Sequence, residues 1–255
     1  MSSTTLSAET RKTAGVPSHA FRTLPGDHRF FSAMAIVMAV TILAGFSNTY
    51  VPRVVTGEPA LPWIIHLHAA VFTSWLVVFV AQTTLVLTGR TAVHRRLGVA
   101  GVTLAALMVV VGAATGIAVT RLGHRGIPGV EFADPEGFLL LNLGAAFVFG
   151  TLVGAGWYFR RDSQTHKRLM LMATAGTLIG PGVSRLPFAS GQPPVIGALA
   201  MAFLLAGPVY DLVTRRRVHQ AYVWSGLLAL TAIPPVVAQL GATDAWHRVA
   251  SLLVR

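Results

Sequence analysis

Apolar positions along this chain group into seven long runs that are separated by short polar stretches. The runs cover residues 30–46, 63–87, 97–120, 137–159, 169–186, 195–213 and 221–240. A helix needs roughly 20 apolar residues to cross the hydrocarbon core of a bilayer, and these runs have about that length. We therefore predict an all-α, polytopic membrane bundle of about seven transmembrane helices.

The two ends of the chain differ from this bundle, which we place at residues 30–240. Residues 1–29 are polar and rich in Ser and Thr, with no apolar run before the first span. They predict a disordered cytoplasmic tail rather than a signal peptide. For residues 241–255 we predict a short C-terminal tail, and an amphipathic segment is one form that it could take.

Composition agrees with a membrane protein, since 53% of the 255 residues are hydrophobic and 11% are charged. Soluble domains usually carry about 25% charged residues. There are no cysteines, so disulfides, thiolate metal sites and cysteine nucleophiles are excluded. Acidic residues are few and none lies deep in a run, which disfavours paired-carboxylate catalysis and a carboxylate-bridged di-iron site. No motif identifies an enzyme, and whether the chain is one stays open.

The net charge of +11 is distributed unevenly between the two sides of the predicted bundle. With the N-terminus inside, the inner side holds 14 basic and four acidic residues, and the outer side holds six and five. The positive-inside rule then predicts a multi-pass protein of the inner (plasma) membrane, with the N-terminus cytoplasmic and the C-terminus outside. Anionic headgroups on the inner side, and not nucleic acid, are the expected partner of this charge.

Three inner turns resemble one another, and each places a histidine at the start of the following run: His94, His166 and His219. This weak repeat predicts one leading helix followed by three helical hairpins. The three imidazoles either converge on a cofactor or lie separately in the headgroup zone. Neighbouring arginines oppose a bare divalent cation but pair with the propionates of haem. If a cofactor is bound, we therefore favour haem b.

The inner histidines predict one layer of polar side chains. Polar groups inside the runs predict a second such layer, near the outer side of the membrane. His68, Phe72, Trp75, Phe79 and Gln82 share one helical face of the second run, which should point into the bundle. His68 is expected to be either a buried structural histidine, a cofactor ligand or a proton-relay or substrate contact. It lies roughly 21 Å along the helix from Gln82, which belongs to the inner layer.

The C-terminal half is predicted to be irregular. Pro181 stands between two glycines and should break the fifth run, and Pro208, Pro234 and Pro235 interrupt later runs. Arg185 follows the break, and we expect it to face the bundle or a wet outer cavity as part of the outer cofactor-binding layer.

The block from His66 to Gly98, which contains Gln82, Arg90 and His94-Arg95-Arg96-Leu97-Gly98, resembles the predicted bacterial membrane proteins grouped as domain of unknown function 2306. His166, Met170 and Arg185 resemble a second block of that family. The resemblance implies a multi-span fold and no particular reaction. The chain is more loosely similar to the cytochrome b561 type, in which histidines of a helical bundle ligate two haems.

Four functional hypotheses follow. The first is a redox membrane protein that binds haem or a metal through His68, His94, His166 and His219, with a redox partner or as a homo-oligomer. The second is a small-solute transporter or channel-like protein, in which the proline-broken runs 169–186, 195–213 and 221–240 move around a polar path. The third is an accessory membrane protein without a cofactor, and the fourth is a lipid- or isoprenoid-modifying enzyme.

Overall fold

The computed structural model describes residues 23–58 and 60–255, and it confirms an all-α helical bundle. The long helices are α1 (Asp27–Ser47), α3 (Trp63–Leu87), α4 (Thr91–Arg121), α5 (Pro135–Tyr158), α6 (Ser163–Thr177) and α8 (Pro193–Arg215). Shorter helices are α2 (Tyr50–Thr56), α7 (Ile179–Val183), α9 (Gln220–Leu230), α10 (Pro234–Gly241) and α11 (Asp244–Val254). Strands β1 (Gly126–Ile127) and β2 (Val130–Glu131) pair antiparallel in a small hairpin.

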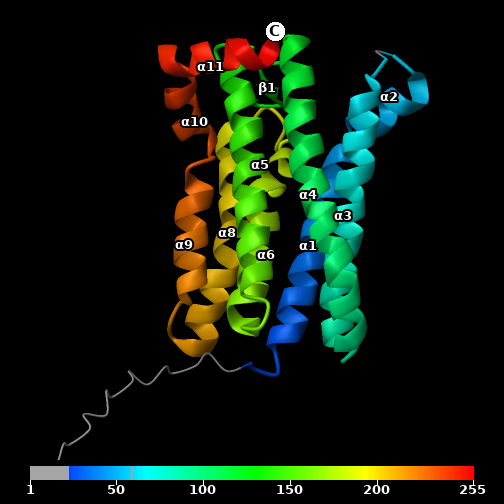
Figure 1. Cartoon of the computed structure of the whole chain (residues 1–255), viewed down its shortest axis with the longest axis vertical. Coiled ribbons are helices and arrows are strands. Elements are labelled where there is room, and N and C mark those ends of the chain that lie inside the picture. The colour runs from blue at the N-terminus through cyan, green and yellow to red at the C-terminus, as the bar shows by residue number, and fades with distance from the viewer. Residues whose placement is uncertain (1–22, 59) are drawn as a thin grey trace, which may run out of the picture.

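The long helices stand side by side along the long axis of the molecule (Figure 1). We call the end at which α1 begins the lower end; the turns that follow α3, α5 and α8 lie there too. The upper end carries α2, the β-hairpin and the C-terminus, and α11 lies across it. The start of α1 and the C-terminus therefore lie at opposite ends of the bundle.

Among the described residues, five helices are long and apolar enough to cross a membrane: α1, α3, α4, α5 and α8. The pair α9 and α10, bent by 42° at its break, makes a sixth crossing if it counts as one span. The remaining predicted span, residues 169–186, falls on the end of α6, on α7 and on the residues that follow α7. These helices, of 15 and 5 residues, are too short to be counted as crossings. The count of seven therefore stays a prediction.

Helix α6 is less apolar because it lies inside the bundle. It packs against α1, α5, α8 and α9. Residues 171–174 cover a full turn, and each exposes at most 1% of its surface. A helix enclosed by other helices need not present an apolar surface to lipid, so its polar side chains can pair with neighbours.

The breaks predicted at Pro181 and at Pro234 are present, whereas the interruption predicted at Pro208 is not. Helix α6 ends at Thr177, and α7 holds Pro181, which has no N–H to continue the α6 hydrogen-bond pattern. Helix α7 packs closely on α1, where an added Cβ on Gly182 would lie 2.9 Å from the Cα of Ile42. Pro208 lies within α8 without ending it, whereas α10 begins at Pro234.

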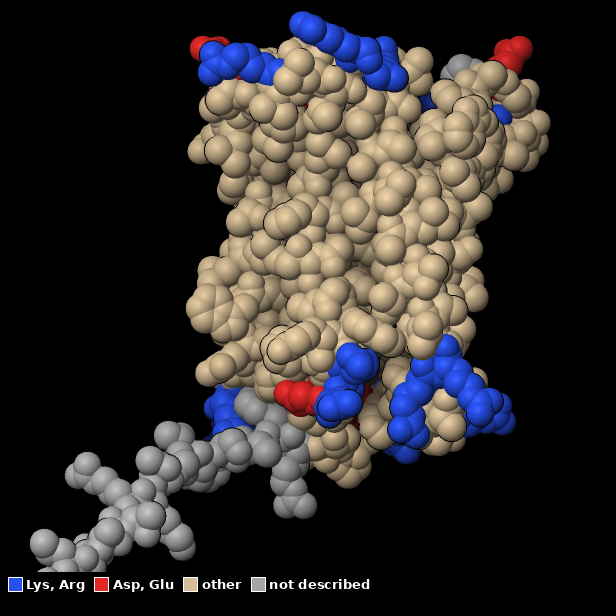
Figure 2. All heavy atoms as spheres, in the orientation of Figure 1, with Lys and Arg blue, Asp and Glu red and all other residues tan. Residues whose placement is uncertain are grey.

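Charged side chains gather at the two ends of the molecule. On the face shown in Figure 2, the band between the ends is free of Lys, Arg, Asp and Glu. Large apolar side chains are exposed along the helices, as for Val40 (59%), Val110 (65%) and Phe147 (65%). Such a surface would be unstable in water and suits a lipid environment. The chain is thus an integral membrane protein.

The predicted tails need one correction. Residues 1–22 lie outside the described residues, but Asp27 to Arg29, which we assigned to the tail, form the first turn of α1. The reason is that buried Asp27 is bound to other helices, as shown below. Within residues 241–255, α11 packs on the upper end through Trp246, whose Nε1 donates to the carbonyl of Glu136 at 2.7 Å. Leu252 of the same helix is 69% exposed, so α11 has one docked and one apolar exposed side.

Candidate functional site

Three consecutive residues near the start of α6 contact three different neighbours at the lower end. They are His166, Lys167 and Arg168, and successive helix positions point about 100° apart. His166 faces α4 and α5, Lys167 faces α1, and Arg168 faces α8. The start of α6 is thus the point at which the lower ends of these helices are joined.

Arg168 and Asp211 form the most buried ion pair of this region. Arg168 Nε donates to Oδ2 of Asp211 at 2.8 Å, Nη2 donates to Oδ1 at 2.6 Å, and both side chains are fully buried. Arg168 Nη1 also donates to Oε1 of Gln164 at 2.9 Å. Asp211 accepts a further bond from Arg215 at 3.1 Å. Asp211 thus has a basic partner on each of two helices, which offsets part of the cost of burying these charges.

Asp27 ties α1 to the same network. Its carboxylate accepts from Lys167 Nζ at 2.6 Å, from Arg215 Nη2 at 2.6 Å and from the hydroxyl of Tyr210 at 3.1 Å. Phe30, one turn further along α1, stacks on Tyr210 with ring centroids 3.9 Å apart. One buried carboxylate therefore joins α1, α6 and α8.

His94 and His166 form a pair between α4 and α6. Their ring centroids lie 6.2 Å apart, with the ring planes at 82°. Nδ1 of His166 lies 2.8 Å from the carbonyl oxygen of Gly156 and must donate to it, because a carbonyl only accepts. The lone pair of a neutral His166 is then on Nε2. Nδ1 of His94 and Oε1 of Gln82 are buried without a hydrogen-bond partner among the described residues.

His219 has a different local role. Its Nδ1 accepts from the backbone N–H of Ala221 at 3.1 Å, so it caps the start of α9. Burial lowers the pKa of His219, and the positive charge of Arg168 lowers it further. Within residues 23–58 and 60–255, no group of three or more His, Asp or Glu side chains is placed to hold a metal ion. The predicted convergence is thus found for two of the three histidines.

The outer-layer residues lie at the upper end. His68 stacks on Phe72 with ring centroids 3.8 Å apart, and its Nδ1 is buried without a partner among the described residues. The guanidinium of Arg185 lies 4.4 Å from the ring centroid of Phe46 and within electrostatic range of His68. His66 does not join these residues: its Nδ1 lies 2.8 Å from the hydroxyl oxygen of Tyr50. The predicted inward face of α3 is confirmed, since Trp75 and Phe79 are buried.

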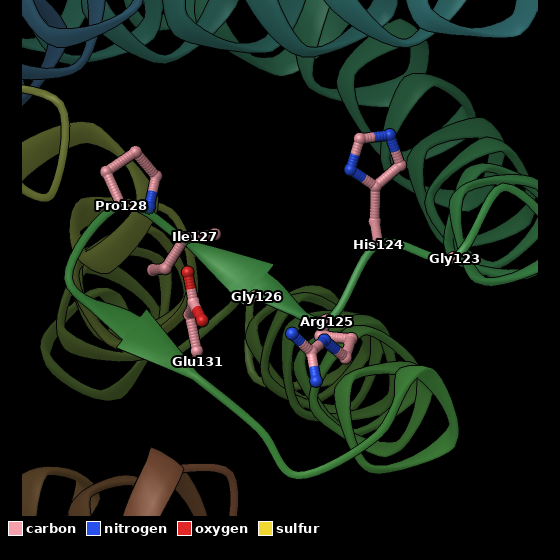
Figure 3. Close-up of a pocket in the computed structure, with 7 residues that line it drawn as sticks. All are labelled: Gly123, His124, Arg125, Gly126, Ile127, Pro128 and Glu131. Carbon is pink, nitrogen blue, oxygen red and sulfur yellow. The ribbon is translucent and has the colours of Figure 1, made fainter.

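A surface hollow of about 340 Å³ lies beside the β-hairpin at the upper end. Figure 3 shows its lining: Gly123, His124, Arg125, Gly126, Ile127, Pro128 and Glu131. These residues are exposed or half-buried, and His124 projects away from the two strands in this view. The hollow is formed by a surface turn, and no buried polar group faces it.

Sequence reasoning missed Asp27, Lys167 and Arg168 as parts of a site. The sequence pattern places Asp27 in the tail, and it indicates for the two bases only a role in membrane topology. One signal was present: Asp27 lies just before the apolar run 30–46, and Asp211 lies near the end of the run 195–213, so each carboxylate lies where a basic turn can reach it. Which base pairs with which acid depends on the packing of α1, α6 and α8.

Comparison with known proteins supplies no relative for this chain: no protein family, no curated protein and no solved structure matches it.

Proposed function

We propose that this integral membrane protein is a redox protein that binds haem iron through His94 and His166. The observation that carries the proposal is the pairing of these two rings, which come from different helices and lie 6.2 Å apart. Two imidazoles that ligate one iron by bonds of about 2 Å have centroids roughly 6 Å apart.

The surroundings of the pair support a ligand role. The bond from His166 Nδ1 to the Gly156 carbonyl orients the ring and leaves Nε2 for a metal, as is usual for metal-bound histidines. The buried, unpartnered Nδ1 of His94 and Oε1 of Gln82 lack the partners that buried polar atoms normally have. Haem would supply one-electron chemistry at this position, so a redox partner belongs to the proposal.

Arginines near the pair suit the charge of this cofactor. Arg95 and Arg96 follow His94 directly and are exposed, so their side chains are available to anionic groups at the lower end. Guanidinium groups pair well with carboxylates such as propionates. A bare divalent cation would instead be repelled by them and would find two histidines rather than the three or four ligands that it usually takes.

The same proposal places the lower end in the cytoplasm and the bundle in the inner (plasma) membrane, with seven crossings. Basic residues crowd the turns of the lower end: Arg90, Arg95, Arg96, Arg160, Arg161, Arg216 and Arg217. A positive cytoplasmic side is the general rule, and anionic headgroups would neutralise it. The start of α1 and the C-terminus lie at opposite ends, as an odd number of crossings requires.

The test is the absorption spectrum and iron content of detergent-purified protein expressed with a haem precursor. We expect a Soret band and about one iron per chain. His94→Ala and His166→Ala should each lose most of the band, while His124→Ala, at an exposed histidine of the upper end, should keep it. Protein that stays colourless and iron-free after haem is supplied contradicts the proposal.

A transporter is the second candidate, because the ion pairs of Asp27 and Asp211 hold the lower ends of α1, α6 and α8 against one another. Helix α7, broken from α6 and packed on α1, is an element that such a protein can move. This candidate predicts colourless protein that a specific transported solute stabilises against heat.

A further inference from the structure

The upper end holds a positive charge that has no acidic partner in the part of the chain that the structure describes. Arg185 follows α7, and its Nη1 donates to the carbonyl of Pro181 at 2.7 Å and to Ser184 Oγ at 3.4 Å. Its guanidinium packs on the ring of Phe46. A second base, Arg53, lies within electrostatic range of it.

The lower end treats its buried arginine differently. Arg168 is fully buried and is paired twice with the carboxylate of Asp211. A cation withdrawn from water is costly unless an anion compensates it, and carbonyl, hydroxyl and aromatic contacts compensate only in part. Among the residues that the structure describes, no carboxylate compensates Arg185 in this way.

A second unsatisfied group lies within electrostatic range of Arg185. His68, on α3, has a buried Nδ1 without a hydrogen-bond partner among the described residues. Its ring is held in place by stacking on Phe72. Phe72 in turn packs against α4, where a Cβ on Gly112 would lie 3.3 Å from it. The imidazole is thus held in place, within electrostatic range of Arg185.

We propose that Arg185 and His68 bind an oxyanion at the upper end. The guanidinium presents paired N–H donors that match the oxygens of a carboxylate or phosphate, and the imidazole can supply one more hydrogen bond. Phe46 contacts Arg185 and Phe72 contacts His68, so both groups have an aromatic neighbour, which favours an organic anion. This site lies at the opposite end from His94 and His166, and the inference does not depend on haem.

The test measures thermal unfolding of the purified, delipidated full chain in a neutral detergent at constant ionic strength. The probes are inorganic phosphate, succinate, short-chain phosphatidylglycerol and, as the zwitterionic counterpart, short-chain phosphatidylcholine. We expect a saturable rise in Tm of at least about 2 °C with one of the first three and none with phosphatidylcholine. A response to phosphatidylglycerol alone identifies a lipid headgroup, and a response to phosphate or succinate identifies a water-soluble anion.

Variants separate a specific site from the general stabilising effect of phosphate. Arg185→Gln should abolish the saturable shift, whereas Arg248→Gln, at an exposed arginine of the same end, should keep it. His68→Phe preserves a ring for the stack and should at least halve the shift. If Arg185→Gln does not fold, His68→Phe decides alone. A wild-type chain that none of the three anions stabilises, or variants that keep the full shift, overturns the inference.

Discussion

Arg168 and Asp211 meet in a two-point ion pair inside the bundle, with 2.8 Å between Nε and Oδ2 and 2.6 Å between Nη2 and Oδ1. Arg168 belongs to α6 and Asp211 to the last turns of α8, so the pair joins two helices through residues 43 positions apart. Removing one partner would leave the other charge buried and unpaired.

We therefore predict that Asp211→Leu lowers the free energy of unfolding by about 3–5 kcal/mol. The double variant Arg168→Leu with Asp211→Leu should lose less than the sum of the single losses, because it buries no unpaired guanidinium at that point. Unfolding in detergent, followed by helical circular dichroism, measures both. Arg161→Leu, an exposed lower-end control, should change stability by less than about 0.5 kcal/mol. Additive losses would show that the pair is not coupled.

Helix α1 should depend on the lower-end carboxylate in a similar way. Asp27→Asn keeps the size of the side chain but removes the charge that binds Lys167 and Arg215. We expect a loss of about 2–4 kcal/mol and faster hydrogen exchange in the first turns of α1, measured by mass spectrometry. Asp244→Asn, at the exposed start of α11, is the matched control. Unchanged exchange in α1 would mean that Asp27 does not anchor it.

The close packing of α1 and α7 predicts a steric effect. A Cβ on Gly45 would overlap the carbonyl oxygen of Gly182, so Gly45→Ala should destabilise the protein by about 1–3 kcal/mol. Gly154 has nothing within 4 Å of such a Cβ, and Gly154→Ala should be neutral or mildly stabilising because it rigidifies the unfolded chain. Thermal melts of both variants compare them directly. Equal melting temperatures would argue against this helix contact.

Docking of α11 should depend on pH. The pKa of His247 is raised by its hydrogen bond to the Thr243 carbonyl, by its bond to Asp134 and by the charges of Asp134 and Glu136. The stabilising effect is therefore complete below the ordinary imidazole pKa of about 6.5 and is lost as the pH rises through the raised value. Amide exchange in α11, corrected for intrinsic rates, should speed up between pH 5.5 and 8.5. His247→Gln should remove this change, and the same pH response in that variant would exclude His247 as its cause.

The proposed orientation is testable because the chain contains no cysteine. Ser163→Cys at the lower end should react with an impermeant maleimide only after lysis. Ala133→Cys and Ala242→Cys, both exposed at the upper end, should react in intact cells. The reverse pattern would invert the topology. Labelling of Ser163→Cys and Ala242→Cys from the same side would mean that the number of crossings is even.

The helical bundle and its breaks could be predicted because they depend on local properties of the chain. Apolar runs of span length can be stable only as buried or lipid-facing helices, and Pro181 and Pro234 cannot continue a helix's hydrogen bonds wherever they lie. The inward face of α3 followed from helical periodicity alone. The crossing count was harder, because α6 lies inside the bundle and does not carry the apolar signal of a lipid-facing helix.

The partners of the polar side chains were decided only by the tertiary structure. The sequence places His94, His166 and His219 at equivalent positions, yet the first two meet while the third caps α9. Asp27 read as part of a tail until the packing of α1, α6 and α8 placed two cations around it. Helix formation depends on neighbours along the chain, whereas these pairings depend on which helix faces meet, and that is set by the close packing of residues such as Gly45 and Gly182.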